Sequence, residues 1–185
     1  KPYWSRRARI TIWPKKGIIV SSLSISEVNN LFELRLLLEP YSIQNYGYTL
    51  DENVLMDYYQ KFLRMDLTGL QEFFVIDDNF HDFLNNAVPN HYIQENFKII
   101  NNQNQRIRII TGQRAVQRLE DTRSEHLAIV KACVKKDWKA AAEAMYEHLL
   151  HPKTLPLRCC SAGTICSSTL KREAFPAGNA GAGLL

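Results

Sequence analysis

The sequence predicts an all-α protein, in which an antiparallel bundle of six to seven helices follows a short β-ribbon. Apolar residues recur with a helical period from Ser26 onward, which is typical of amphipathic helices. Gly47, Gly69 and Pro89 mark short connections between the periodic segments, and short connections favour antiparallel neighbours in a bundle. Before Ser26, residues with high β-propensity replace this pattern.

The β-ribbon is expected within residues 9–20. Ile10, Ile12 and the run 18–20 favour strands, and the Pro-Lys-Lys-Gly cluster at 14–17 favours a turn between them. Two strands alone are only marginally stable in water. We therefore expect this ribbon to pack on another part of the protein.

Six helices are expected to follow the ribbon. Ser26 is a suitable N-cap for the first helix, and Gly47 is a suitable residue to end it. Pro152 ends the last helix, because proline cannot continue a helix. The helices after the first are expected at about 52–67, 69–87, 90–119, 122–136 and 138–150.

The charge distribution along the chain is uneven. The 185 residues are 45% hydrophobic and 23% charged, which excludes wholesale disorder. Residues 1–16 carry six basic and no acidic residues, whereas residues 17–150 carry 13 basic and 18 acidic residues, a net charge of −5. This distribution argues against a uniformly basic nucleic-acid binder, and it leaves an acidic body with a basic head to be explained.

The sequence implies neither a membrane span nor a disulfide framework. No apolar run is long enough to span a membrane. Of four cysteines, three lie in the tail at positions 159, 160 and 166, so they do not form a framework for the body. A reducing, cytoplasmic setting is expected.

Three of the five histidines fall on the apolar faces of three different predicted helices. His81 follows Asp77 by four residues in the third helix, so their side chains stack on one face. His126 and His148 are in phase with the apolar residues of the fifth and sixth helices. A buried carboxylate among imidazoles is stabilised if all four groups share a cation. Three nitrogen ligands and one oxygen ligand suit zinc, with nickel, manganese and iron as further options.

Each candidate site has a simpler interpretation. Each histidine could be a core residue with its own hydrogen bond. Arg35 is in phase with the apolar face of the first helix, where it could clamp a carboxylate, or it could form an ordinary surface pair with Glu39. Lys15 and Lys16, at the tip of the ribbon, suit phosphate contacts but could equally be a solvated charge run.

Several of these motifs together resemble one protein family. The segments 77–81, 125–129 and 147–149 resemble the signature of the ligand-binding domain of GntR-superfamily transcription regulators of the FadR type, known as the FCD domain. The segment 34–40 resembles the opening helix of that domain. The segment 9–24 resembles the wing that ends the family's winged helix-turn-helix.

The resemblance implies a domain organisation and a function. Residues 1–22 are expected to be the C-terminal remnant of a winged helix-turn-helix, residues 26–150 a helical effector-binding domain, and residues 151–185 an unstructured tail. The family helices that precede the wing are not in this sequence.

In many family members the residues that match Asp77, His81, His126 and His148 bind a divalent metal that helps to hold a small organic acid. The residue that matches Arg35 is often part of the effector pocket. The resemblance further implies a homodimer whose geometry controls DNA binding when the acid binds.

Two other functions are compatible with parts of the sequence. His81 and Asp82 resemble the dyad of helical metal-dependent phosphohydrolases, but those enzymes need an upstream histidine and none precedes His81. A helical dimerisation module without a ligand is the other alternative. We expect a regulator and no enzymatic activity.

Overall fold

The computed structural model describes residues 3–4, 10–13, 17–20, 24–111 and 116–150, and side chains are described within 24–107 and 118–150. The strands β1 (Tyr3–Trp4), β2 (Ile10–Trp13) and β3 (Gly17–Val20) form an antiparallel sheet in that order. In the β2–β3 pair, Ile10 lies opposite Val20 and Trp13 opposite Gly17. The sequence predicted this pair but not β1, because two residues are too short to show a period.

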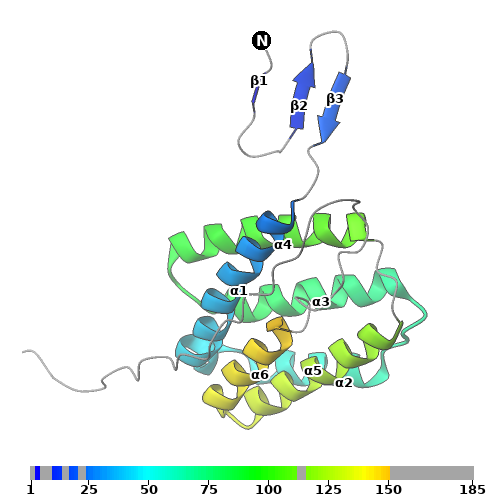
Figure 1. Ribbon diagram of the computed structural model, residues 1–185. Coiled ribbons are helices and arrows are strands. Elements are labelled where there is room, and N and C mark those ends of the chain that lie inside the picture. The colour runs from blue at the N-terminus through cyan, green and yellow to red at the C-terminus, as the bar shows by residue number, and fades with distance from the viewer. Residues whose placement is uncertain (1–2, 5–9, 14–16, 21–23, 112–115, 151–185) are drawn as a thin grey trace, which may run out of the picture. The chain divides into compact units, whose positions relative to one another are not determined.

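Six α-helices and one 3-10 helix make up the rest of the described chain (Figure 1). They are α1 (Ile25–Tyr46), η1 (Gly47–Thr49), α2 (Glu52–Arg64), α3 (Leu70–Asn85), α4 (His91–Thr111), α5 (Val116–Val134) and α6 (Trp138–Leu150). The all-α fold class is therefore confirmed. The predicted boundary between the fourth and fifth helices was wrong: α4 ends at Thr111 and α5 begins at Val116. Residues 116–119, which were predicted to end the fourth helix, belong to α5.

The N-cap of helix α1 lies two residues before the predicted one, because Ser24 and Glu27 form a capping box. The Ser24 hydroxyl accepts from the Glu27 backbone N–H at 3.2 Å, and the Glu27 carboxylate accepts from the Ser24 N–H at 3.0 Å. The predicted N-cap, Ser26, lies within the helix instead. A serine followed three residues later by glutamate is the sequence signature of this cap.

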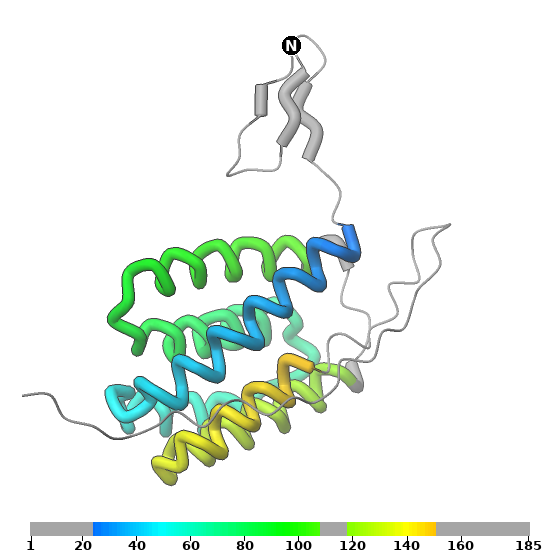
Figure 2. Tube along the Cα trace, turned by 60° about the vertical axis from the view of Figure 1, so that its left-hand side comes forward, coloured from blue at the N-terminus to red at the C-terminus, as the bar shows by residue number. Residues whose placement is uncertain are grey.

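Helix α1 runs between α4 and α6 (Figures 1 and 2). Its extensive contacts are with α6, which packs in turn on α5, and α5 packs on α2. Gly47 lets α1 end against the first residue of α6, since a Cβ at Gly47 would lie only 2.4 Å from Cε3 of Trp138. The packing of α1 on α6 sets the position of α1 relative to a helix that carries one of the three histidines, His148.

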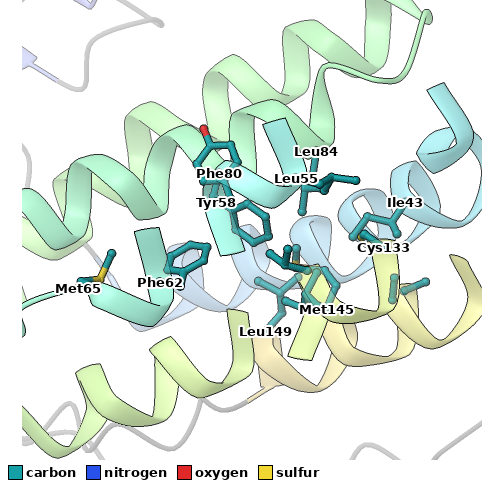
Figure 3. Close-up of a cluster of buried hydrophobic side chains, with 14 of the residues drawn as sticks. Ile43, Leu55, Tyr58, Phe62, Met65, Phe80, Leu84, Cys133, Met145 and Leu149 are labelled. Atoms are coloured by element: carbon teal, nitrogen blue, oxygen red, sulfur yellow. The ribbon is translucent and has the colours of Figure 1, made fainter. Parts of the chain in front are cut away.

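The main apolar core is built by α1, α2, α3, α5 and α6 (Figure 3). Its fully buried side chains include Leu55 and Phe62 of α2 and Phe80 of α3. Helix α4 has a separate, smaller cluster in which Phe97 and Ile100 pack with Val88, against partly buried leucines of α1. No helix of the described chain is long and apolar enough to cross a membrane.

Candidate metal and effector site

Several polar and charged side chains are buried inside the bundle. Because an unpaired buried polar group is costly, the partners of these groups show what the interior is built to hold. Each of them has less than a tenth of its surface exposed. They are Arg35, Glu39, Ser42, Asp77, His81, Asn85, Asn104, Thr122, His126 and His148.

Helical periodicity places the histidines among apolar residues. In α3, Asp77 and His81 share the inward face with Phe73, Phe80 and Leu84, which are all buried. A polar residue on such a face is carried into the interior with its apolar neighbours. His126 of α5 and His148 of α6 are buried in the same way, among Ile129 and Val130 and beside Met145 respectively.

The structure brings the four predicted metal ligands together from three helices. The ring centroids of His81, His126 and His148 are 4.6–5.3 Å apart. One ring nitrogen of each histidine lies within 4.8 Å of the corresponding nitrogens of the other two. Asp77 Oδ1 lies 3.3 Å from Nε2 of His126 and 4.0 Å from Nε2 of His81.

Glu39 of α1 fixes the orientation of His81. Its Oε2 lies 2.7 Å from Nδ1 of His81, and its Oε1 accepts from Nε of Arg35 at 2.6 Å. Burial would raise the pKa of the Glu39 carboxyl, but the charge of Arg35 and the contact with His81 outweigh it and hold the pKa well below its usual range. The ionised carboxylate can only accept, so Nδ1 of His81 donates. In the neutral ring, Nε2 then carries the lone pair.

Glu125 of α5 does the same for His148. Its Oε2 lies 2.7 Å from Nδ1 of His148, and Arg118 donates to both of its oxygens, at 2.8 and 3.1 Å. Burial would raise the pKa of Glu125, but these hydrogen bonds lower it to about 2. Burial lowers the pKa of His148 to about 4, and Glu125 offsets this only in part. His148 is therefore neutral near pH 7, with the lone pair on Nε2.

His126 is held by ring packing. Its ring centroid lies 4.8 Å from that of Phe62 and 5.3 Å from that of Phe80, and none of its surface is exposed. These rings come from α2 and α3, which contribute to the main apolar core. Thus aromatic side chains fix one histidine of the cluster, whereas glutamates fix the other two.

The chemistry of these groups fits a divalent metal. Metal-binding histidines are usually neutral, with one ring nitrogen free for the metal and the other donating a hydrogen bond, often to a carboxylate. Ligand atoms around a tetrahedral zinc ion lie about 3.3 Å apart. The Asp77 to His126 separation of 3.3 Å already has this value, and the histidine nitrogens need only a modest approach. The cluster could therefore hold a metal ion through Asp77, His81, His126 and His148.

Arg35 is buried, which agrees with the interpretation that it lies on the inward face of α1, where it could clamp a carboxylate. The predicted pair with Glu39 exists, but it lies in the interior and not on the surface, since the two side chains are 6% and 1% exposed. Arg35 also donates from Nη1 to Oδ1 of Asn104 on α4 at 3.4 Å, and its guanidinium lies 5.3 Å from the Phe32 ring centroid. Lys15 and Lys16 lie outside the described residues.

Glu39, Glu125 and Arg118 were not identified as site residues from the sequence. A signal was present for Glu39, which follows Arg35 by one turn on the same face. Glu125 directly precedes His126, so the helical period points it elsewhere, and its contact with His148 joins two helices. No local pattern predicts such a contact.

Asp82 does not join the cluster, which weakens the phosphohydrolase interpretation. Its Oδ1 accepts from the side-chain amide of Asn101 on α4, so it ties α3 to α4. A catalytic dyad would need the Asp82 carboxylate at the same metal as His81, but this carboxylate is taken up by Asn101 of α4. The metal-binding face of α3 carries Asp77 instead.

Two surface depressions lie away from this chemistry. Both are lined by Lys131 and Lys135, together with residues of α2, α5 and α6. Neither is lined by a histidine of the cluster or by Arg35. The buried polar groups, and not these two depressions, indicate the site.

Comparison with known proteins agrees with the sequence motifs. The FCD domain family matches residues 30–151. The chain is 26% identical over 148 residues to the HTH-type transcriptional repressor RspR of Escherichia coli K12 and, with the same figures, to the HTH-type transcriptional regulator YdfH of Shigella flexneri. These matches cover 76% of this chain and 63% of each relative, so the chain spans less than two thirds of their length.

A solved structure, that of Streptococcus agalactiae GntR, has the same fold. It superposes with a TM-score of 0.56 at 22% identity, over 80% of this chain and 75% of the other. The family match and the relatives favour a regulatory domain over an enzyme. The chain therefore belongs to the FCD domain family, which confirms its resemblance to the ligand-binding domain of GntR-superfamily regulators.

Proposed function

We propose that this domain is the sensor of a cytoplasmic, DNA-binding transcription regulator, and that it binds a divalent metal together with a small organic acid. The observation that carries the proposal is the convergence of Asp77, His81, His126 and His148 inside the bundle. Zinc is the preferred ion because the set offers three nitrogens and one oxygen. Bound there, it would act as a Lewis acid toward a carboxylate.

Arg35 is proposed to hold the carboxylate of the effector. Its guanidinium is nearly fully buried, and a buried guanidinium is suited to planar, two-point recognition of a carboxylate. The nearby Asn104 of α4, within 3.4 Å, supplies an amide of the kind that orients polar ligands. In this proposal, Arg35 and the metal held by the cluster both bind the acid.

The switch is proposed to act through a homodimer. An acid that binds one arrangement of two such domains more tightly than another shifts the population toward that arrangement. The relatives are named as HTH-type transcription regulators, which supports an output on DNA. Residues 1–22 are proposed to be the C-terminal part of the winged helix-turn-helix DNA-binding domain. There, Lys15 and Lys16 would contact DNA phosphates.

A melting screen tests the effector proposal. The zinc-loaded protein is heated with hydroxy acids, sugar acids and fatty acids, because a ligand that binds the native state raises the melting temperature. We expect at least one acid class to stabilise the unmutated protein and to lose this effect in Arg35→Lys, which keeps the charge but not the planar fork. If no acid stabilises the zinc-loaded protein, a ligand-free dimerisation module becomes the better account.

A further inference from the structure

We propose that Glu39 is a positioning residue that couples metal occupancy to helix α1, which supplies no metal ligand of its own. The proposal rests on the metal site proposed above and deepens it. All four candidate ligands lie on α3, α5 and α6. Among the described residues, Glu39 is the α1 side chain that bonds directly to one of them.

The contacts of Glu39 leave it little freedom. Each carboxylate oxygen has one partner: Oε1 faces Nε of Arg35 at 2.6 Å, and Oε2 faces Nδ1 of His81 at 2.7 Å. The side chain is 1% exposed, so water does not compete for these bonds. Arg35, His81 and Glu39 therefore form a continuous buried chain from α1 to α3.

A metal held by His81 would strengthen this chain of contacts. The metal would withdraw electron density from the imidazole ring, which makes the N–H at Nδ1 a better hydrogen-bond donor. Conversely, the Glu39 carboxylate that accepts from this N–H makes the ring a better metal ligand. By thermodynamic linkage, the two effects have the same coupling free energy. Metal binding should therefore tighten the bond between α3 and α1, and loss of Glu39 should weaken metal binding.

The pair Glu125 and His148 provides a matched comparison within the same site. Its geometry is nearly the same, with 2.7 Å between Oε2 and Nδ1, but it joins α5 to α6, both of which already carry ligands. The Glu39 bond, in contrast, joins His81 to α1, a helix outside the ligand set. In the chain, α1 is the first helix after the strands β1 to β3, so it is the element through which a signal would pass toward residues 1–22.

Hydrogen exchange with zinc alone as the probe tests the coupling. The full chain and the variants Glu39→Gln and Glu125→Gln are each saturated with zinc, and zinc-dependent protection is measured helix by helix. We expect zinc to slow exchange in α1 of the unmutated protein and of Glu125→Gln, but not in Glu39→Gln, where α3, α5 and α6 keep their protection. We also expect the zinc affinity of Glu39→Gln to fall by about 10- to 100-fold.

Three outcomes separate the possible failures. If zinc protects α1 equally in Glu39→Gln, the coupling runs through the α1–α6 packing and the proposal is wrong. If the unmutated protein binds zinc without any change in α1, the proposal is also wrong although the metal site stands. If it binds no zinc, the proposed site fails and this proposal with it.

The design also separates coupling from general loosening of α1. A purely structural role for Glu39 would raise exchange in α1 with and without zinc, and would leave the zinc-dependent difference intact. If Glu39→Gln does not fold, Glu39→Asp replaces it, because the shorter carboxylate keeps the charge for Arg35 but withdraws from His81. The same outcomes then apply.

Discussion

Leu55 and Glu39 are buried to the same extent in one bundle, with 0% and 1% of their surface exposed, yet their surroundings differ completely. Leu55 lies in the apolar core formed by five helices. Glu39 lies in a polar cluster, which here means Arg35, Glu39, Asp77, His81, His126 and His148. The apolar core gains free energy from burial itself. The polar cluster gains it only through specific partners.

This difference separates what stabilises the fold from what serves the proposed function. A buried ion pair is weak support for stability, because desolvation of two charges offsets much of their attraction. A bundle that needed only stability would place apolar residues where Glu39 and Asp77 lie. The proposed metal site accounts for their presence beside three histidines.

The largest effect on stability is expected in the apolar core. Leu55→Ala removes fully buried methyl groups and should lower the free energy of unfolding by about 2–5 kcal/mol. The neighbouring substitution Met56→Ala is the control, because Met56 is 43% exposed, and it should change stability by less than about 0.5 kcal/mol. Urea unfolding measures both. Equal effects would contradict the assignment of the core to the Leu55 side of α2.

Zinc binding at the polar cluster should raise the free energy of unfolding of the protein. At a free zinc concentration about 1,000 times Kd, binding to the native state should add about 4 kcal/mol. His148→Ala removes a ligand from α6 and should abolish most of this gain. Thermal melts with and without zinc measure it. Zinc stabilisation of the same size in His148→Ala would exclude that histidine as a ligand.

Asn85 lies one helical turn beyond His81 and shows the cost of a polar interior. It is 2% exposed, and neither its side-chain oxygen nor its nitrogen has a hydrogen-bond partner within the described part of the chain. Replacement by an apolar residue of similar size removes this penalty, so Asn85→Leu should raise the free energy of unfolding by about 1–3 kcal/mol. Asn96→Leu, at an exposed position of α4, is the control. A loss of stability in Asn85→Leu would mean that Asn85 has a structural partner.

The smallest effect is expected at a position outside both regions. Ser24→Ala removes the capping box of α1 and should lower stability by about 1 kcal/mol. Because Ser24 does not touch the polar cluster, the affinity for zinc should stay unchanged. A combined zinc titration and urea unfolding measures both quantities. Weaker zinc binding in Ser24→Ala would show that the start of α1 contributes to the site.

The sequence predicted the helices better than it predicted their partners. Period 3.6 placed Asp77, His81, His126 and His148 on inward faces, since a helix carries every residue of its apolar face into the core. The same period could not show that Glu39 reaches His81, or that Glu125 reaches His148, because these contacts join different helices.

Two boundary errors have local causes. The fourth helix was predicted to run to residue 119 although Gly112, a residue type that commonly follows the last turn of a helix, comes directly after Thr111. The start of α1 was misplaced to Ser26 because both serines are acceptable caps, and only the position of Glu27 three residues after Ser24 distinguishes them.

Metal analysis of the purified protein tests the central claim most directly. We predict one divalent ion per chain in the unmutated protein and in His91→Ala, whose histidine is exposed at the start of α4. We predict that His81→Ala and His148→Ala lose the ion while they stay helical by circular dichroism. An unmutated protein without stoichiometric divalent metal, even after incubation with zinc and removal of the excess, would contradict the account.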